Sequence, residues 1–128
     1  MKVTDLMVGD WVTLHGKRRV RCENILGHTN DVMLENGVVT NVMNLEPIAL
    51  TDSILERCMG KKDDYGYYWL RTDFYDVDLY ECSDSIWRIY CHYTDSTTPI
   101  NHTAEISYVH EFQHFMRLCG IFDEIIKF

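Results

Sequence analysis

The sequence predicts an α+β protein: an N-terminal SH3-like small β-barrel lobe, a hinge helix, and an antiparallel β-meander with a packed C-terminal helix. Three observations predict this class. Short apolar segments separated by turn residues fill the first fifty positions, alternating segments follow a capped helical stretch, and an apolar arc at helical spacing comes last. A chain of 128 residues can form one domain or two small lobes. We divide it into a β lobe at 1–50 and an α+β lobe at 51–128, which we expect to form one compact unit.

The first fifty residues indicate four or five short strands joined by tight turns. Residues 15–17 suit a hairpin turn, and Asn36-Gly37 strongly signals a two-residue hairpin. Short strands at this spacing predict an SH3-like barrel or a curled sheet. Pro47 then ends the lobe, because proline cannot donate a hydrogen bond to a strand ladder.

The second lobe begins with a predicted helix at 51–60, which we interpret as the hinge. Thr51 is a suitable N-cap, Asp52 lies at the positive end of the helix, and Gly60 follows as a stop signal. The segments from 61 to 106 alternate between apolar and polar residues, with a loop at 95–99. This pattern predicts a meander of three or four strands with one buried and one polar face.

The last predicted element is a helix at 108–119 that covers the meander. At 100° per residue, one broad arc of this helix collects its apolar side chains, Tyr108, Val109, Phe112, Phe115, Met116 and Cys119. His110, His114 and Arg117 fall on the opposite side. We therefore expect the helix to turn both histidines toward solvent.

The composition limits the classes of function. A net charge of −8 argues against a general binder of nucleic-acid backbones, which needs clustered Lys and Arg. No apolar run is long enough to span a membrane, and the first residues lack the apolar core of a signal peptide. The five cysteines are odd in number and form no C-x-x-C pair, which is typical of buried reduced thiols. We expect a cytoplasmic protein, and the sequence leaves its oligomeric state open.

Charge is unevenly distributed between the lobes. Residues 1–50 carry five Lys and Arg against six Asp and Glu, whereas residues 51–128 carry seven against fourteen. Ordinary solvated surface explains such a bias, and an acidic docking face for a basic partner protein is the functional alternative. Strand residues between 65 and 80 are also rich in Tyr and Trp, which either pack a sheet or build a protein-binding surface.

The pentapeptide His-Glu-Phe-Gln-His at 110–114 has the H-E-x-x-H spelling of zinc metallopeptidases. On a helix, His110 and His114 lie one turn apart and could bind one zinc ion, with Glu111 as the catalytic base. The longer form of the motif requires a third histidine at the position of Gly120, and Arg117 shares the polar face. A third ligand would have to come from upstream, from His92, His102 or Cys91.

The only basic cluster lies at 15–21. Its members Lys17, Arg18, Arg19 and Arg21 could contact phosphates, with Trp11 as a stacking platform. A solvated hairpin is the explanation that we favour for the cluster, so nucleic-acid contact is the weakest of the alternatives.

Four short segments, considered together, also point to a family. They are 3–12, 47–51, 108–113 and 118–120. In these segments the chain resembles a family of small proteins encoded by Bacteroidetes, their phages and their mobile elements. Members read Tyr-Val-His-Gln-Leu-Gln-Asn in the third segment, so the first histidine matches, whereas Glu111 and His114 depart from the pattern. The resemblance implies a packing helix that acquired H-E-x-x-H, and it brings no assigned activity.

From these observations we expect a non-catalytic protein-interaction module of phage or mobile-element origin that needs no cofactor. Its expected partner is a host or phage protein, and an accessory role in host takeover or anti-defence is a hypothesis drawn from the genomic setting, small size and acidity. The sequence does not decide whether the chain is an enzyme. The alternatives are a zinc-dependent hydrolase that uses 110–114 and nucleic-acid contact through 15–21.

Overall fold

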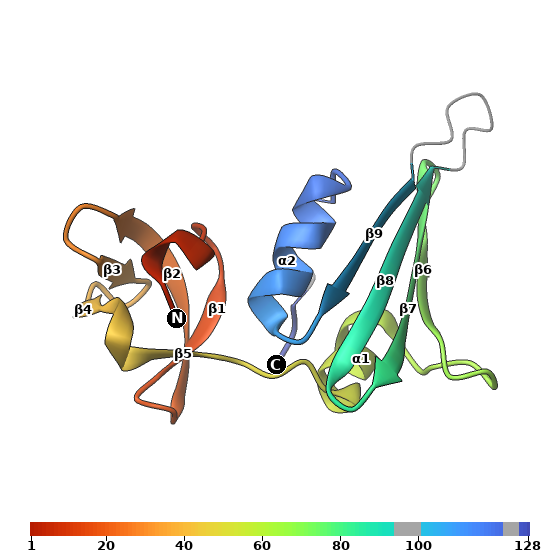
Figure 1. The fold of residues 1–128 in the computed structure, drawn as a ribbon, viewed down its shortest axis with the longest axis horizontal. Coiled ribbons are helices and arrows are strands. Elements are labelled where there is room, and N and C mark those ends of the chain that lie inside the picture. Colours follow the sequence, from red (N-terminus) through yellow and green to blue (C-terminus); the bar gives the residue numbers. More distant parts are fainter. Residues whose placement is uncertain (94–100, 122–125) are drawn as a thin grey trace. The chain divides into compact units, whose positions relative to one another are not determined.

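The computed structural model describes residues 1–93, 101–121 and 126–128 and has a mixed α+β fold (Figure 1). The described residues form two antiparallel sheets, two α-helices and two 3₁₀-helices. They divide into a first unit, Met1–Ala49 with Tyr108–His114, and a second unit, Leu50–Ser107 with Phe115–Phe128. The first turns of the C-terminal helix thus belong to the first unit, whereas the division at residue 50 had placed them in the second. No helix in the described ranges is long and apolar enough to cross a membrane.

The first unit is built on a five-stranded sheet with the order β4-β3-β2-β1-β5. Its elements are η1 (Val3–Asp5), β1 (Trp11–Leu14), β2 (Arg18–Leu26), β3 (Asp31–Leu34), β4 (Val39–Asn41), η2 (Val42–Asn44) and β5 (Leu45–Pro47). The edge strands β4 and β5 do not pair with each other, so this sheet is not a closed barrel within the described residues. The prediction of short strands is confirmed, and β5 ends at Pro47 as expected.

Alternation along the strands explains the core of the first unit. Val12 and Val20 lie opposite each other in the β1–β2 pair and are almost completely buried, as are Val32 and Leu34 on β3. Side chains of a strand point alternately to its two faces, so these residues gather on one side of the sheet. Cys22 joins this cluster, and burial raises the pKa of its thiol to about 12.

The turn between β3 and β4 differs from the predicted two-residue hairpin. The N–H of Leu34 bonds to the carbonyl oxygen of Val38 at 2.8 Å, so residues 35–37 form a three-residue loop. Gly37 adopts a φ of 82°, a left-handed conformation that glycine takes without strain. The Asn36 side chain accepts a hydrogen bond from the Val38 N–H at 3.0 Å, which stabilises the longer loop.

The second unit is built on a four-stranded meander with the order β6-β7-β8-β9. Its elements are α1 (Asp52–Met59), β6 (Tyr68–Arg71), β7 (Tyr75–Ser83), β8 (Ile86–Tyr93), β9 (Asn101–Ile106) and the last residues of α2 (Val109–Leu118). The predicted meander is confirmed with four strands, and the loop predicted at 95–99 lies outside the described residues. Its inner face buries Tyr68, Val77, Leu79, Ile89 and Cys91.

Helix α1 has the boundaries that its end residues predict. The Thr51 hydroxyl accepts a hydrogen bond from the Ile54 N–H at 3.4 Å, and Gly60 follows the last turn with a φ of 85°. The Tyr68 hydroxyl donates a 2.6 Å hydrogen bond to the Asp52 carboxylate, which ties the start of α1 to the start of β6. Burial, and then the Asp52 carboxylate, raise the pKa of Tyr68.

All five cysteines are free thiols, as predicted. Cys22, Cys91 and Cys119 are buried, and Cys58 is half-buried. The prediction of buried thiols is wrong for Cys82, which is exposed next to the β7–β8 turn. Burial raises the pKa of both Cys91 and Cys119, whose side chains hydrogen-bond to each other.

Candidate functional site

The H-E-x-x-H pentapeptide lies in the first turns of α2, where Glu111 has a structural role. Its Oε1 accepts a hydrogen bond from the backbone N–H of Tyr108 at 3.1 Å. Tyr108 immediately precedes the helix, so Glu111 occupies the third helical position, from which a glutamate closes a capping box. A negative side chain there also interacts favourably with the positive end of the helix. This geometry accounts for the glutamate without a catalytic base.

Gln113 joins the helix to the loop that precedes β1. Its Oε1 accepts a hydrogen bond from the Trp11 N–H at 2.9 Å, and its Nε2 donates to the Gly9 carbonyl oxygen at 3.0 Å. Gln113 is buried, so each bond satisfies a backbone group that water reaches poorly. The side-chain amide therefore pairs with the backbone on both sides of Asp10 much as a neighbouring strand would.

His114 extends this contact to the side chain of Asp10. Its Nε2 lies 2.6 Å from Oδ2 of the Asp10 carboxylate, which also accepts a 2.7 Å hydrogen bond from the Met7 N–H. Asp10 is completely buried, and a buried carboxylate requires such donors. Because the carboxylate can only accept, Nε2 of His114 carries the proton in this contact.

The expectation that both histidines face solvent is wrong for His110, whereas the side chain of His114 is half-buried, with 29% of it exposed. His110 is 7% exposed, and its Nδ1 is buried without a hydrogen-bond partner. Burial lowers its pKa, and the negative charge of Asp10 only partly opposes this effect. The helical wheel failed because the polar side of α2 packs on Gly9, Asp10 and Trp11, about a hundred residues away in sequence. Tyr108, assigned to the apolar arc, is instead 39% exposed.

A pocket of about 660 Å³ lies beside these histidines in the first unit. It is lined by Met1, Thr4, Asp5, Met7, Pro47, Tyr108, His110, Glu111 and His114. The histidine donors do not fit a zinc ion well, because Nε2 of His114 is bound to Asp10. In the described parts of the chain, no group of three or more His, Cys, Asp or Glu side chains could hold a metal ion.

The basic cluster lies on the β1–β2 hairpin. Lys17, Arg18 and Arg19 are exposed, and the guanidinium of Arg21 lies 5.6 Å from the ring centroid of Trp11. The predicted stacking platform is therefore already in contact with an arginine of its own hairpin. This arrangement favours a solvated hairpin over a surface for bases.

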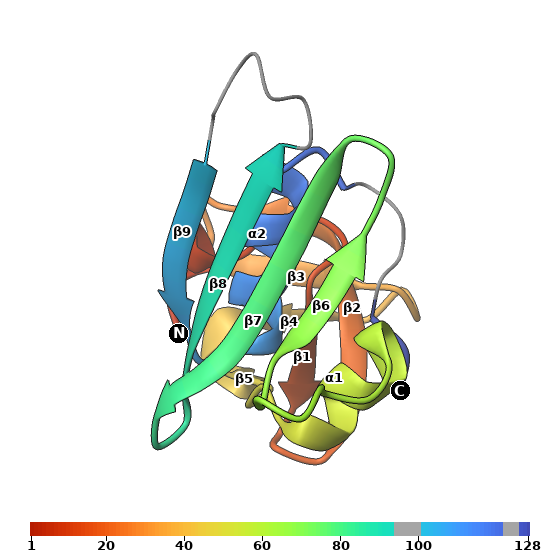
Figure 2. The same cartoon turned by 90° about the vertical axis from the view of Figure 1, so that its right-hand side faces the viewer.

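A second constellation lies on the outer face of the four-stranded sheet, onto which Figure 2 looks. The register places these side chains on that face: Trp69, Arg71, Asp76, Asp78, Tyr80, Arg88, Tyr90, His92, Thr103 and Glu105. On the inner face Tyr68, Val77, Leu79, Ile89 and Cys91 are buried, whereas these side chains are exposed or half-buried. Within the described residues, no helix of the second unit covers this face.

Four rings form a continuous row across the outer face. The ring centroids of Tyr67 and Tyr80 are 5.0 Å apart. Those of Tyr80 and Tyr90 are 6.3 Å apart with nearly parallel planes, and Tyr90 and His92 repeat this arrangement at 6.3 Å. We call Tyr67, Tyr80, Tyr90 and His92 the aromatic row. Ring contacts of this kind limit side-chain motion before any partner binds.

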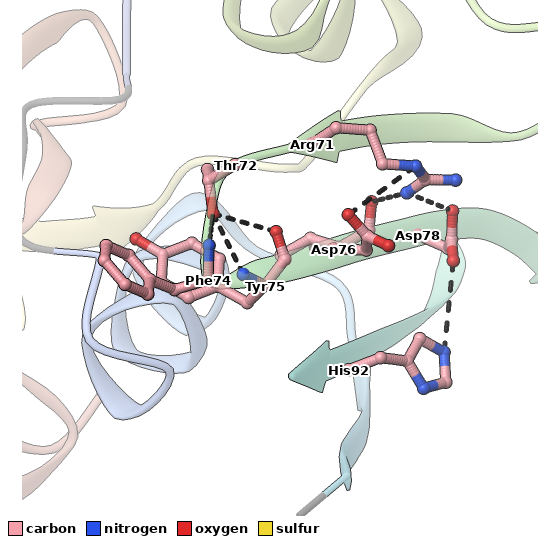
Figure 3. Close-up of polar contacts among 8 residues, drawn as sticks. Arg71, Thr72, Phe74, Tyr75, Asp76, Asp78 and His92 are labelled. Carbon is pink, nitrogen blue, oxygen red and sulfur yellow. Dashed lines mark hydrogen bonds and ion pairs between the residues drawn. The ribbon is translucent and has the colours of Figure 1, made fainter. Parts of the chain in front are cut away.

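Ion pairs hold the charged side chains of this face in place. Arg71 lies between Asp78, at 3.0 Å, and Asp76, at 3.8 Å, and its guanidinium is 5.0 Å from the ring centroid of Trp69 (Figure 3). His92 Nε2 is 4.0 Å from the other oxygen of Asp78. These contacts give the end of the sheet near the β6–β7 turn a defined arrangement of one arginine and two aspartates.

The other end of the outer face is organised by Arg88. Its guanidinium donates to the Glu105 carboxylate at 2.7 Å, and hydrogen bonds to Tyr90 and Tyr80 also help to raise its pKa. A hollow of about 410 Å³ lies here, lined by Arg88, Tyr90, Thr103, Ala104 and Glu105. The outer face thus combines fixed rings, fixed charges and a hollow.

Sequence reasoning identified part of this face. It noted the density of Tyr and Trp and named His92 only as a possible zinc ligand, and it did not single out Arg71, Arg88 or Tyr90 as binding residues. Alternation shows that two faces exist, whereas the diagonal contacts between strands depend on a register that the sequence does not state. Searches against protein-family models, curated proteins and solved structures found no match for the chain.

Proposed function

We propose that the protein is a non-catalytic protein-interaction module whose partner docks on the outer face of β6–β9. The observation that carries the proposal is the aromatic row together with Trp69, Arg71 and Arg88 on a sheet face that no helix of the second unit covers. Tyr, Trp and Arg are the residue types most enriched at the energetic centres of protein interfaces. The roles of Glu111 and Gln113 in capping and packing support the non-catalytic assignment.

A protein fits this face better than a nucleic acid does. Asp76, Asp78 and Glu105 place three carboxylates among the rings, whereas Arg71 and Arg88 are already engaged in ion pairs. Phosphate groups would meet these carboxylates and a chain of net charge −8. A folded protein can supply apolar contacts to the rings and complementary charges to the acids.

The biological setting of the proposal comes from the sequence resemblance. We place the chain among accessory proteins of phages or mobile elements, acting on a host or phage protein in the cytoplasm, with host takeover or anti-defence as its purpose. An SH3-like description of the first unit is supported by the strand order β4-β3-β2-β1-β5 and by the 3₁₀-helix η2 between β4 and β5. Such a lobe would serve as a scaffold in this proposal.

Affinity capture tests the proposed function. The purified chain is immobilised and exposed to extract from a Bacteroidetes host, in parallel with the variant Trp69→Ala/Tyr90→Ala. We expect wild type to retain a protein that the variant does not, because the variant removes two rings from the outer face, one on β6 and one on β8, and leaves the inner-face side chains unchanged.

Tyr65→Ala provides the matched control. Tyr65 is 87% exposed in the Asp63–Gly66 turn and lies outside the aromatic row, so its removal should leave capture unchanged. Circular dichroism checks that all three proteins are equally folded. Identical sets of retained proteins for wild type and the double variant would overturn the proposal.

A further inference from the structure

One exposed ring of the second unit has no packing role in its own sheet. Phe74 lies in the turn between β6 and β7 and is 73% exposed. A phenylalanine exposed to this degree gains little from burial in its own unit, and phenylalanine is among the residue types enriched in the cores of protein interfaces. Figure 3 shows Phe74 at one end of the polar cluster that contains Arg71, Asp76 and Asp78.

The turn that presents Phe74 is held by a single threonine. The Thr72 hydroxyl donates to the Tyr75 carbonyl oxygen at 2.8 Å and accepts from the Tyr75 N–H at 3.1 Å and the Phe74 N–H at 3.4 Å. The Thr72 N–H bonds to the same carbonyl oxygen at 3.0 Å. A ring on a turn fixed in this way loses little conformational freedom on binding, which favours affinity.

The surroundings of Phe74 are acidic. Asp73 precedes it, and Asp76 and Asp78 follow on β7. Residues 71–78 thus carry three aspartates against one arginine, Arg71, which contacts Asp76 and Asp78. A partner surface that meets this cluster is complementary if it bears Lys or Arg.

The geometry points to Phe74 as an anchor that inserts into an apolar socket of the partner protein, with Lys or Arg residues at the rim of that socket facing Asp73, Asp76 and Asp78. This inference rests on the proposed function, because it names the partner's chemistry at one end of the same outer face. It also assigns the β6–β7 turn a role in binding.

Photo-crosslinking in host extract tests the anchor separately from the proposed function. The photoreactive analogue p-benzoylphenylalanine is placed at position 74, at 69 or at 65 in otherwise unchanged full-length chains. We expect positions 74 and 69 to crosslink the same host protein and position 65 to give no product. Mapping by mass spectrometry should place the product of position 74 in an apolar pocket flanked by Lys or Arg.

The outcomes separate the two claims. Crosslinking from 69 but not from 74 overturns the anchor and leaves the proposed function standing, whereas no product from either position contradicts both. Products of position 74 in an acidic surface, or only with a second copy of this chain, also overturn the inference. As a quantitative check, the host protein identified by crosslinking is purified in its unmodified form. Phe74→Ala should weaken binding of this protein about tenfold or more, and Tyr65→Ala should not.

Discussion

Asp10 shows how one buried carboxylate organises the contacts of the first unit. Its Oδ2 accepts hydrogen bonds from His114 and from the Met7 N–H, while the backbone on either side of it is held by Gln113. A charge with no exposed surface is tolerated only when such donors surround it. Two polar residues of the pentapeptide, Gln113 and His114, are therefore explained by one loop that must be held against a helix.

His110 predicts a pH dependence of stability. Burial lowers its pKa from the ordinary value of 6.5, so the unfolded chain takes up the proton first as the pH falls. The stability contributed by the neutral ring is complete above 6.5 and is lost as the pH falls from there through the folded-state pKa. Urea unfolding measures the free energy of unfolding at each pH. Between about pH 7.5 and 5.5 this free energy should fall less in His110→Phe than in wild type.

The control for this prediction is His28→Gln, which replaces an exposed histidine in the turn after β2. It should retain the pH dependence of wild type. His110→Phe should also be at least as stable as wild type at neutral pH, because it removes the buried Nδ1 that has no partner. An unchanged pH dependence in His110→Phe would contradict this account of His110.

Gln113 predicts a large effect from a small change. Gln113→Met keeps most of the side-chain volume but leaves the Trp11 N–H and the Gly9 carbonyl without their partner. We expect the free energy of unfolding to fall by about 2–4 kcal/mol, since each buried unpaired backbone group costs about 1–3 kcal/mol. Hydrogen exchange offers a local readout: the Trp11 amide should exchange faster while the Val77 amide of the second unit does not. Unchanged protection of the Trp11 amide in Gln113→Met would show that the two hydrogen bonds of Gln113 contribute little.

At the scale of elements, two substitutions of Glu111 at the start of α2 test whether this residue caps the helix. If Glu111 is a cap, Glu111→Gln keeps an acceptor for the Tyr108 N–H and should cost less than about 1 kcal/mol, whereas Glu111→Ala should cost about 0.5–2 kcal/mol. Chemical unfolding of the two variants measures the difference. Equal destabilisation by both changes would argue against the cap.

The elements also show what local signals can and cannot predict. Thr51 and Gly60 define the ends of α1 through hydrogen bonds and φ angles that involve only near neighbours, so the sequence predicts that helix well. The orientation of α2 depends on Gly9 and Trp11, more than a hundred residues earlier in the chain. A helical wheel contains no information about a loop that brings its own hydrogen-bonding groups to the polar side.

At the scale of the whole molecule, the α+β class follows from periodicity, but the candidate site does not. Alternation in β7 and β8 indicates an inner and an outer face, whereas the row from Tyr67 to His92 arises only when the strand register brings the rings together. The pentapeptide at 110–114 shows the limit of a short motif, because its spelling matches H-E-x-x-H whereas zinc chemistry also depends on a third ligand that the spelling does not supply.

Metal content tests the zinc alternative on the intact protein. Because His114 is bound to Asp10 and Glu111 to a backbone N–H, we expect purified protein dialysed against zinc and then against buffer to hold much less than stoichiometric zinc. Atomic emission spectrometry measures the ratio. Stoichiometric zinc in wild type, together with no zinc in the folded His110→Phe variant, would restore the hydrolase alternative.

The central claim is that the outer face of β6–β9 binds a protein, and the affinity of that complex tests it most directly. Isothermal titration of the purified host protein recovered by capture should give a Kd that rises at least about tenfold in Trp69→Ala and stays unchanged in Tyr65→Ala. This result is expected because Trp69 lies on the outer face, whereas Tyr65 is equally aromatic and lies outside it. The same Kd for wild type and Trp69→Ala/Tyr90→Ala would contradict the account.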